Sequence, residues 1–156
     1  MKIFLIKTIS LSIPILIILL LVNYFGDASR IFDNEYEKDM AKIMNKGKHI
    51  TNFGNCDERI LQKELILRWT YTPDIVIIGS SRTMQISSES FPGLSLFNNS
   101  VSSASLNDII GIYQLYKDKN VVPDKIIIGI DPLLFSANHK DERWRSIESS
   151  YYKFKN

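Results

Sequence analysis

Residues 74–86 read DIVIIGSSRTMQI, and the fold of the chain depends on them. Four consecutive β-branched residues, 75–78, lie between the turn residues Asp74 and Gly79. A continuous apolar run of this length is typical of a parallel strand that is buried on both faces. Two serines and an arginine follow the glycine. They either place a reactive serine at the edge of a sheet or begin an ordinary serine-capped helix.

The apolar spacing on both sides of this stretch predicts an α/β fold. Helices are expected over 57–70 and 106–117, and further strands over 94–97 and 125–130. The last of these, KIIIGI, is apolar on both faces and is expected to be a central strand. Helix, strand, strand, helix, strand is the beginning of a doubly wound, flavodoxin-like parallel sheet of three layers. Short helical turns between Thr83 and Ser90 are expected to cover the first crossover.

The N-terminal segment has the composition of a membrane anchor. Residues 8–25 carry no charge, and Lys2 and Lys7 precede them. A helix of this length spans roughly 27 Å, close to the thickness of the bilayer's hydrocarbon core. An uncleaved anchor over 1–26 is favoured over a cleaved signal peptide or a buried soluble helix. The flanking lysines place the N-terminus in the cytoplasm, so the rest of a single-pass protein lies outside it, with the lipid bilayer as one partner.

Two further regions are expected after the anchor, a polar tether over 27–56 and an α/β domain over 57–156. Apolar residues make up 45% of the chain and the formal net charge is +2, which gives no reason to expect a nucleic-acid partner. Cys56 is the single cysteine, so the chain has no internal disulfide, and no metal-ligand spacing surrounds it. Neither a metal nor an organic cofactor is expected.

In a doubly wound sheet, ligands bind beyond the carboxyl ends of the strands. Three segments are expected to meet there: 79–82, 98–105 and 129–131. A serine in a strand-to-helix turn projects outward, and neighbouring N–H groups can face a developing oxyanion. Helix capping is the competing explanation for these serines. A phosphate-binding loop is a third, but the G-x-x-x-x-G-K-[ST] pattern is absent.

Taken together, three blocks resemble the SGNH (GDSL-like) hydrolase superfamily, especially its membrane-anchored bacterial branches linked to surface glycans. They are VIIGSSRTMQI, FNNSVSSASLNDIIG and PDKIIIGIDPLLF, and the likeness covers about residues 58–136. The resemblance implies that Ser81 is the nucleophile and that its backbone N–H is an oxyanion donor. It implies a second backbone N–H donor at Ser103. Asn98 is a candidate side-chain donor, and loop capping explains it equally well.

The chain departs from the family pattern at several positions. Arg82 replaces a leucine, and is a candidate to bind a carboxylate or phosphate of a glycan substrate. Asp131 replaces the asparagine of the third block, and the alternatives for it are a strand-end cap or an ion pair with Arg82. The family's base is the histidine of a D-x-x-H block, which this chain lacks; its two histidines are His49 and His139.

The resemblance therefore leads to two expectations about function. The first is an anchored, extracytoplasmic serine esterase or acyltransferase acting on cell-surface glycan esters. Its α/β domain is incomplete in this chain, and a missing C-terminal portion or a partner chain would supply the base. The second is a non-catalytic, membrane-tethered module for binding or assembly in the synthesis of envelope polysaccharide.

Overall fold

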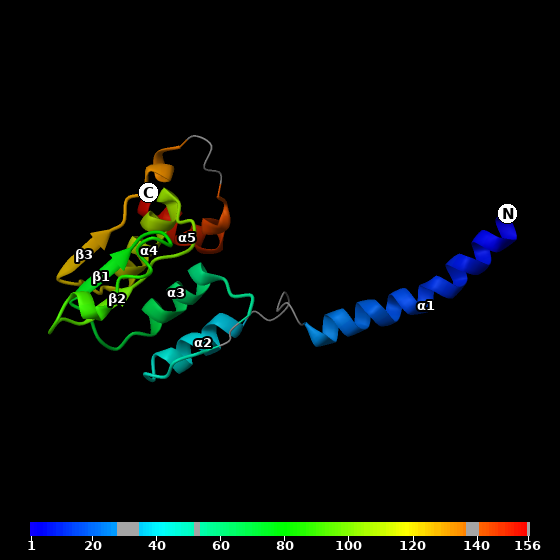
Figure 1. Cartoon of the computed structure of the whole chain (residues 1–156), viewed down its shortest axis with the longest axis horizontal. Helices are drawn as coiled ribbons and strands as arrows, with labels where there is room; N and C mark the ends of the chain where they lie inside the picture. Colours follow the sequence, from blue (N-terminus) through cyan, green and yellow to red (C-terminus); the bar gives the residue numbers. More distant parts are fainter. Residues whose placement is uncertain (28–34, 52–53, 137–140, 156) are drawn as a thin grey trace. The chain divides into compact units, whose positions relative to one another are not determined.

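Figure 1 shows the computed structural model of the chain, which describes residues 1–27, 35–51, 54–136 and 141–155. The chain divides into two compact units, Met1–Tyr36 and Glu37–Asn156. The first unit contains a long apolar helix. The second contains a parallel sheet with its covering helices, and the candidate site lies in this second unit.

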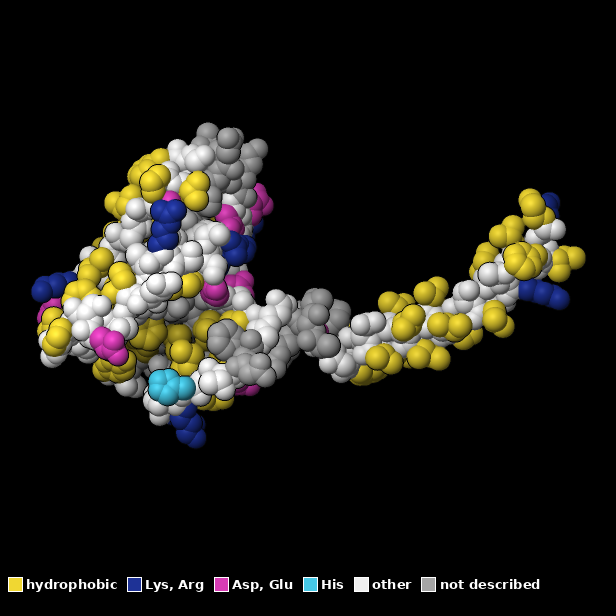
Figure 2. Space-filling model, viewed as in Figure 1, with side chains coloured by type: hydrophobic (Ala, Val, Ile, Leu, Met, Phe, Trp, Pro, Cys, Tyr) yellow, Lys and Arg dark blue, Asp and Glu magenta, His cyan; other side chains and the backbone are white. Residues whose placement is uncertain are grey.

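The helix of the first unit, α1, runs over Lys2–Gly26. Its most apolar window has a mean hydropathy of 2.6, and none of that window is buried within the protein. Figure 2 shows hydrophobic side chains along the whole length of α1. Pro14 lies inside the helix without ending it. By length and composition, α1 can cross a bilayer, which is consistent with a membrane anchor or a signal sequence.

The sheet of the second unit has three parallel strands in the order β2-β1-β3. These are β1 (Ile75–Ile78), β2 (Leu96–Asn98) and β3 (Lys125–Ile128). Every residue of the central strand β1 is buried, as its apolar run predicts. The chain leaves β1 in one direction to form β2 and then crosses back past β1 to form β3. The connection after β1 and the connection before β3 therefore lead to opposite sides of β1, and they separate at the ends of β1 and β3.

The expectation that residues 125–130 form a central strand is wrong for the described sheet. β3 ends at Ile128 and lies at an edge, and no strand among the described residues pairs with its outer side. The crossover past β1 gives β1 the central place instead. Lys125 and Ile128 are consequently exposed, and Ile126 and Ile127 are half-buried.

Two capped helices cover one face of the sheet. The first, α3 (Glu58–Arg68), begins at Asp57, whose carboxylate accepts hydrogen bonds from two backbone N–H groups of the first turn. The second, α4 (Leu106–Lys119), begins with a capping box, in which the side chains of Ser105 and Asp108 each accept a hydrogen bond from the other residue's backbone N–H. Apolar side chains of both helices pack in one core with those of the sheet: Ile66, Trp69, Ile109, Ile112, Leu115, Tyr116, Val76 and Ile78.

The opposite face of the sheet lies under the connection between β1 and β2. The Asn98 side chain points to this face and donates to the carbonyl oxygens of Thr83 and Ile86 at 2.7 and 3.0 Å. A 3₁₀ helix, η1 (Ser88–Ser90), follows, in agreement with the short turns expected there. The structure is therefore a mixed α/β fold with a three-stranded parallel sheet.

The compact second unit begins at residue 37 rather than at residue 57. Helix α2 (Tyr36–Met44) lies inside the predicted tether, yet Met40 and Ala41 are buried. The Glu37 carboxylate also accepts a hydrogen bond from the backbone N–H of Asp57 at 2.8 Å. This contact joins α2 to the start of α3, so α2 belongs to the domain.

The C-terminal segment folds back onto α4. A 3₁₀ helix, η3 (Arg143–Ile147), leads into α5 (Glu148–Lys155), and both contact α4. Ile147 is fully buried beside Gly111, where an added Cβ would lie 3.0 Å from the Ile147 side chain. The small residue on α4 thus makes room for the isoleucine that attaches the end of the chain to the core.

A buried ion pair joins α3 to α4. Arg59 and Asp108 are both almost inaccessible to solvent, and Arg59 Nε donates to Asp108 Oδ1 at 2.9 Å. Arg59 Nη2 also donates to the carbonyl oxygen of Ser102 at 2.9 Å. One guanidinium group therefore fixes the distance between two helices and the position of the loop between β2 and α4.

We predict that Arg59→Leu lowers the free energy of unfolding by about 3–5 kcal/mol, because it leaves the buried Asp108 carboxylate without its counter-charge. Urea denaturation of the full chain in detergent, followed by the fluorescence of Trp69 and Trp144, measures this loss. Lys42→Leu removes a cation of an exposed ion pair and is the control, with little change expected. Equal effects of the two substitutions would contradict the assignment.

Candidate functional site at the carboxyl ends of the strands

Ser81 lies at the tip of a tight turn that follows β1. The backbone N–H and the hydroxyl of Thr83 both donate to the carbonyl oxygen of Ser80, at 3.0 and 2.8 Å. These bonds close a four-residue turn with Ser81 and Arg82 at its tip. Ser81 is exposed and lies outside any helix. Its placement at the end of a buried strand is as the sequence predicts.

Close packing of two glycines under Thr83 fixes this turn against β3. A Cβ added to Gly79 would lie 3.1 Å from the Cα of Gly129 and 2.4 Å from Thr83 Oγ1. A Cβ added to Gly129 would lie 2.5 Å from Thr83 Cγ2. Only glycine at both positions leaves room for the threonine side chain. Sequence reasoning found Gly79 and Gly129 but missed Thr83, whose role depends on a neighbour 46 residues away.

The loop between β2 and α4 forms the second side of the site. Its exposed residue Ser103 has a φ of +49°, a left-handed conformation that favours glycine. The preceding residue is fixed by α3, because the Glu58 carboxylate accepts bonds from both the N–H and the hydroxyl of Ser102.

Asp131 forms the third side and pairs with Arg82, as one of the two alternatives for it expects, whereas its other bond caps a 3₁₀ helix and not the end of the strand. Its Oδ1 accepts a hydrogen bond from the Leu133 N–H at 3.1 Å, which caps the 3₁₀ helix η2 (Pro132–Phe135). Its Oδ2 lies 3.2 Å from Arg82 Nε. The carboxylate is buried, whereas the Arg82 side chain is 72% exposed. The guanidinium group thus balances the charge of Asp131 and still faces solvent.

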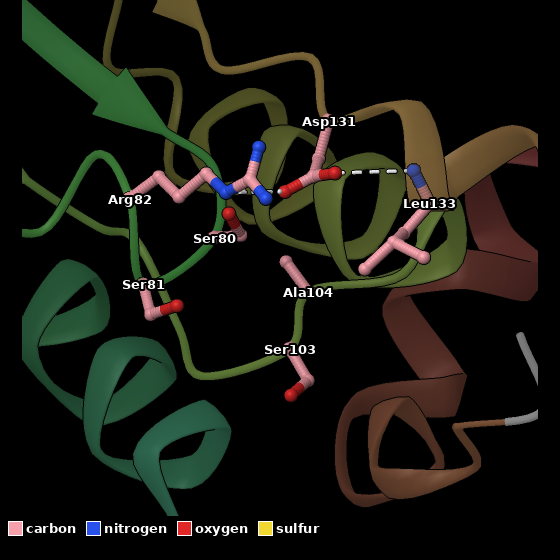
Figure 3. A pocket seen from close by; sticks show the side chains of 7 residues that line it. All are labelled: Ser80, Ser81, Arg82, Ser103, Ala104, Asp131 and Leu133. Carbon is pink, nitrogen blue, oxygen red and sulfur yellow. Dashed lines mark hydrogen bonds and ion pairs between the residues drawn. The ribbon is translucent and has the colours of Figure 1, made fainter.

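These three segments enclose a hollow of about 200 Å³ (Figure 3). It brings together four of the five predicted site residues: Ser81, Arg82, Ser103 and Asp131. Among the described residues, none makes a hydrogen bond with the Ser81 hydroxyl or with the backbone N–H groups of Ser81 and Ser103. The Ser81 hydroxyl and these two N–H groups are therefore not used by the described protein, and their residues line the hollow next to an exposed guanidinium group.

Asn98, the fifth predicted residue, does not line the hollow. Both N–H bonds of its amide go to the connection between β1 and β2, and its Oδ1 accepts from the Ser100 N–H at 3.0 Å. The neighbouring Asn99 is fully buried and donates to Gln62 Oε1 at 2.6 Å. Both asparagines therefore hold loops, which is the second of the two explanations considered for Asn98.

Among the described residues, no histidine lines the hollow, and its one carboxylate, Asp131, is bound by the Leu133 N–H and by Arg82. His49 is exposed on the segment after α2 and does not line the hollow, and His139 lies outside the described residues. Cys56 is half-buried, and burial raises the pKa of its thiol to about 12, so it stays protonated at neutral pH. In residues 1–27, 35–51, 54–136 and 141–155, no three His, Cys, Asp or Glu side chains are grouped to hold a metal ion.

The packing of Gly129 against Thr83 gives a prediction in which a second substitution restores the lost stability. Gly129→Ala should lower the free energy of unfolding by about 1–3 kcal/mol, because the new methyl group overlaps Thr83 Cγ2. Thr83→Ser removes that methyl group and keeps the hydroxyl, so the double variant should recover most of the loss. Denaturant unfolding of the two single variants and the double variant measures the coupling. Additive effects would show that the two side chains do not meet.

Backbone strain at Ser103 gives a second prediction. Ser103→Ile should lower the free energy of unfolding by about 1–2 kcal/mol, because the left-handed conformation disfavours a β-branched residue. Ser103→Gly should leave the stability unchanged or raise it slightly. Ser87→Ile is the matched control, since Ser87 is also exposed but has an extended φ of −111°. A loss at Ser87 as large as at Ser103 would show that strain is not the cause.

Comparison of the chain with protein-family models, curated proteins and solved structures found no match.

Proposed function

We propose that this protein is a membrane-anchored serine esterase or O-acyltransferase of the SGNH-like type, acting on ester groups of cell-surface glycans. The observation that carries the proposal is the exposed Ser81 hydroxyl beside the unpaired N–H groups of Ser81 and Ser103 in one hollow. A nucleophile and two converging amide donors are what acyl transfer requires at the reacting carbon.

The strand order supports the finer, doubly wound interpretation of the fold. A sheet of the flavodoxin-like type begins with the order 2-1-3 and binds its ligand where the connections diverge, between strands 1 and 3. Here the order is β2-β1-β3, and the hollow lies beyond the ends of β1 and β3. The position of Ser81 therefore coincides with the expected ligand site of that fold.

In the proposed reaction, Ser81 Oγ forms a bond to the acyl carbon of the substrate. The negative charge that develops on the carbonyl oxygen is stabilised by the N–H groups of Ser81 and Ser103. The ester C–O bond then breaks, and the glycan alcohol leaves with the proton that Ser81 gave up. Water hydrolyses the acyl-serine, or a second alcohol accepts the acyl group, and Ser81 is regenerated.

The proton must pass through a base, and none of the described residues makes a hydrogen bond with the Ser81 hydroxyl to act as one. The candidates are His139 and a histidine from a further C-terminal portion or a partner chain. Arg82 is proposed to bind an acidic group on the glycan, since its guanidinium group is exposed at the rim of the hollow. The proposed topology places the hollow outside the cytoplasm, because Lys2 and Lys7 precede the span.

A non-catalytic binding module is the second candidate, and one observation favours it. None of the described residues makes a hydrogen bond with the Ser81 hydroxyl, so nothing described activates it. In this alternative, the exposed Arg82 and the free amides bind an anionic group of an envelope glycan without reaction. This candidate keeps the membrane anchor and the sheet but has no turnover.

A fluorophosphonate probe that labels activated serines distinguishes the two candidates. We predict labelling of the full gene product in its native membranes, and at least a tenfold loss of labelling in Ser81→Ala. Ser87→Ala removes another exposed serine hydroxyl near the sheet and should label as the parent does. Absence of labelling in a protein with an intact unfolding transition would favour the binding module.

A further inference from the structure

Thr83 binds the oxygen of the peptide group that joins Ser80 to Ser81. Its backbone N–H and its hydroxyl both donate to the Ser80 carbonyl oxygen, at 3.0 and 2.8 Å. A carbonyl oxygen has two lone pairs, so these two bonds use all of its acceptor capacity. The nitrogen of the same peptide group carries the Ser81 N–H, with which no described residue makes a hydrogen bond. The protein thus saturates the oxygen of this peptide group and leaves its N–H unused.

The hydroxyl groups of Thr83 and Ser100 form a pair with one direction. Their oxygens lie 2.7 Å apart, a distance that allows either hydroxyl to be the donor. The single proton of the Thr83 hydroxyl is used on the Ser80 carbonyl oxygen, which can only accept. Ser100 must therefore donate to Thr83. The bonds run from Ser100 through Thr83 to the Ser80 carbonyl, and hydrogen bonds in such a chain strengthen one another.

The hydroxyl pair is held in place by its surroundings. The Asn98 amide donates to the Thr83 carbonyl oxygen at 2.7 Å and accepts from the Ser100 N–H at 3.0 Å. Ser100 is 4% exposed, so little of it is open to competing water. The Thr83 side chain lies against Gly79 and Gly129, where no Cβ would fit. The orientation of the Thr83 hydroxyl is therefore fixed before any ligand arrives.

The same arrangement recurs in the loop between β2 and α4. The Ser103 N–H belongs to the peptide group whose oxygen is the Ser102 carbonyl, and this oxygen accepts from Arg59 Nη2 at 2.9 Å. Arg59 is 2% exposed and is held by its bond to Asp108. A charged donor binds a carbonyl oxygen more strongly than a neutral one does. None of the described residues makes a hydrogen bond with the Ser103 N–H.

Hydrogen bonds on a carbonyl oxygen change the nitrogen of the same peptide group. Resonance moves electron density from the nitrogen to the oxygen, and a donor on the oxygen favours this charge-separated form. The N–H then becomes more polar and donates a stronger hydrogen bond, which is the cooperative effect within hydrogen-bonded chains. Every described peptide bond is trans, so each N–H points away from the carbonyl oxygen and from the side chain that binds it.

We propose that Thr83 and Arg59 are positioning residues, which fix and polarise the two peptide groups whose N–H groups serve as oxyanion donors. Thr83 acts on the Ser81 N–H, and Arg59 acts on the Ser103 N–H. Neither side chain lines the hollow, so both act through the backbone and do not touch the ligand. The use of these donors in acyl transfer rests on the proposed function, whereas the polarisation of the peptide groups does not.

The Ser–Ser pairs of the chain make both peptide groups observable by NMR. Serine labelled with ¹³C at the carbonyl and ¹⁵N at the amide gives one HNCO signal for each of the four pairs, 80–81, 87–88, 102–103 and 149–150. Cell-free synthesis of the full chain into detergent micelles keeps the label on serine. We expect Thr83→Val to move the 80–81 signal upfield in both ¹³C and ¹⁵N, because the oxygen loses a donor, and to leave the 102–103 signal in place.

Three further variants separate polarisation from a general effect on the fold. Arg59→Lys keeps a counter-charge for Asp108 but lacks the planar fork that also reaches Ser102, so it should move only the 102–103 signal. Thr83→Ser keeps the hydroxyl, and its 80–81 signal should stay near that of the parent. Adding Ser100→Ala to Thr83→Val removes the donor that Thr83→Val leaves buried without a partner, and so preserves folding.

The fluorophosphonate probe tests whether the polarisation reaches the reaction. Its phosphoryl oxygen gains negative charge as Ser81 Oγ bonds to phosphorus and fluoride leaves, as the carbonyl oxygen of an ester would. We expect labelling of Thr83→Val to be about threefold to tenfold slower than that of the parent, and labelling of Thr83→Ser to stay close to the parent rate.

The two measurements fail in different ways. An 80–81 signal that does not move in Thr83→Val overturns the inference, and so does a moved signal with an unchanged labelling rate. A signal that moves equally at 80–81 and 102–103 in both Thr83→Val and Arg59→Lys also overturns it, because the change would then be a general one. A parent that is folded but not labelled rejects the proposed acyl transfer instead, and the HNCO signals then decide the inference by themselves.

Discussion

The close contact between the ends of β1 and β3 is the constraint on which the site depends. Gly79 and Gly129 approach so closely that only Thr83 fits above them, and Thr83 in turn closes the turn that exposes Ser81. The Thr83 hydroxyl also lies 2.7 Å from the Ser100 hydroxyl, which connects this turn to the loop after β2. One small side chain therefore joins all three strand ends, and the position of Ser81 follows from that packing.

The sequence predicts the local features of this arrangement and misses the long-range ones. Period and composition located the three strands and the two helices that begin after Asp57 and Ser105. The Arg59–Asp108 pair was missed because its partners are 49 residues apart and each resembles a surface charge. The edge position of β3 was also missed, because an apolar strand predicts cover on both sides and does not say which strand supplies it.

The helices and the sheet serve the site in different ways. The sheet places the Ser81 turn and Asp131 side by side, because β1 and β3 are neighbours with matched register. Helix α3 places the remaining loop, since Glu58 and Arg59 together bind the backbone of Ser102. Ser103 follows directly and adopts its left-handed conformation within a loop that is fixed on both sides. The strain at Ser103 is therefore maintained by contacts that lie outside the hollow.

The ion pair between Arg82 and Asp131 sets the charge at one side of the hollow. A buried carboxylate at position 131, without a counter-charge, would repel an anion in the hollow. Arg82 Nε lies 3.2 Å from Asp131 Oδ2 and offsets part of that charge, while water screens the exposed guanidinium group. The pair also caps η2 and closes one wall of the hollow. Because either group alone would leave an unbalanced charge at the hollow, Arg82 and Asp131 act as one structural unit there.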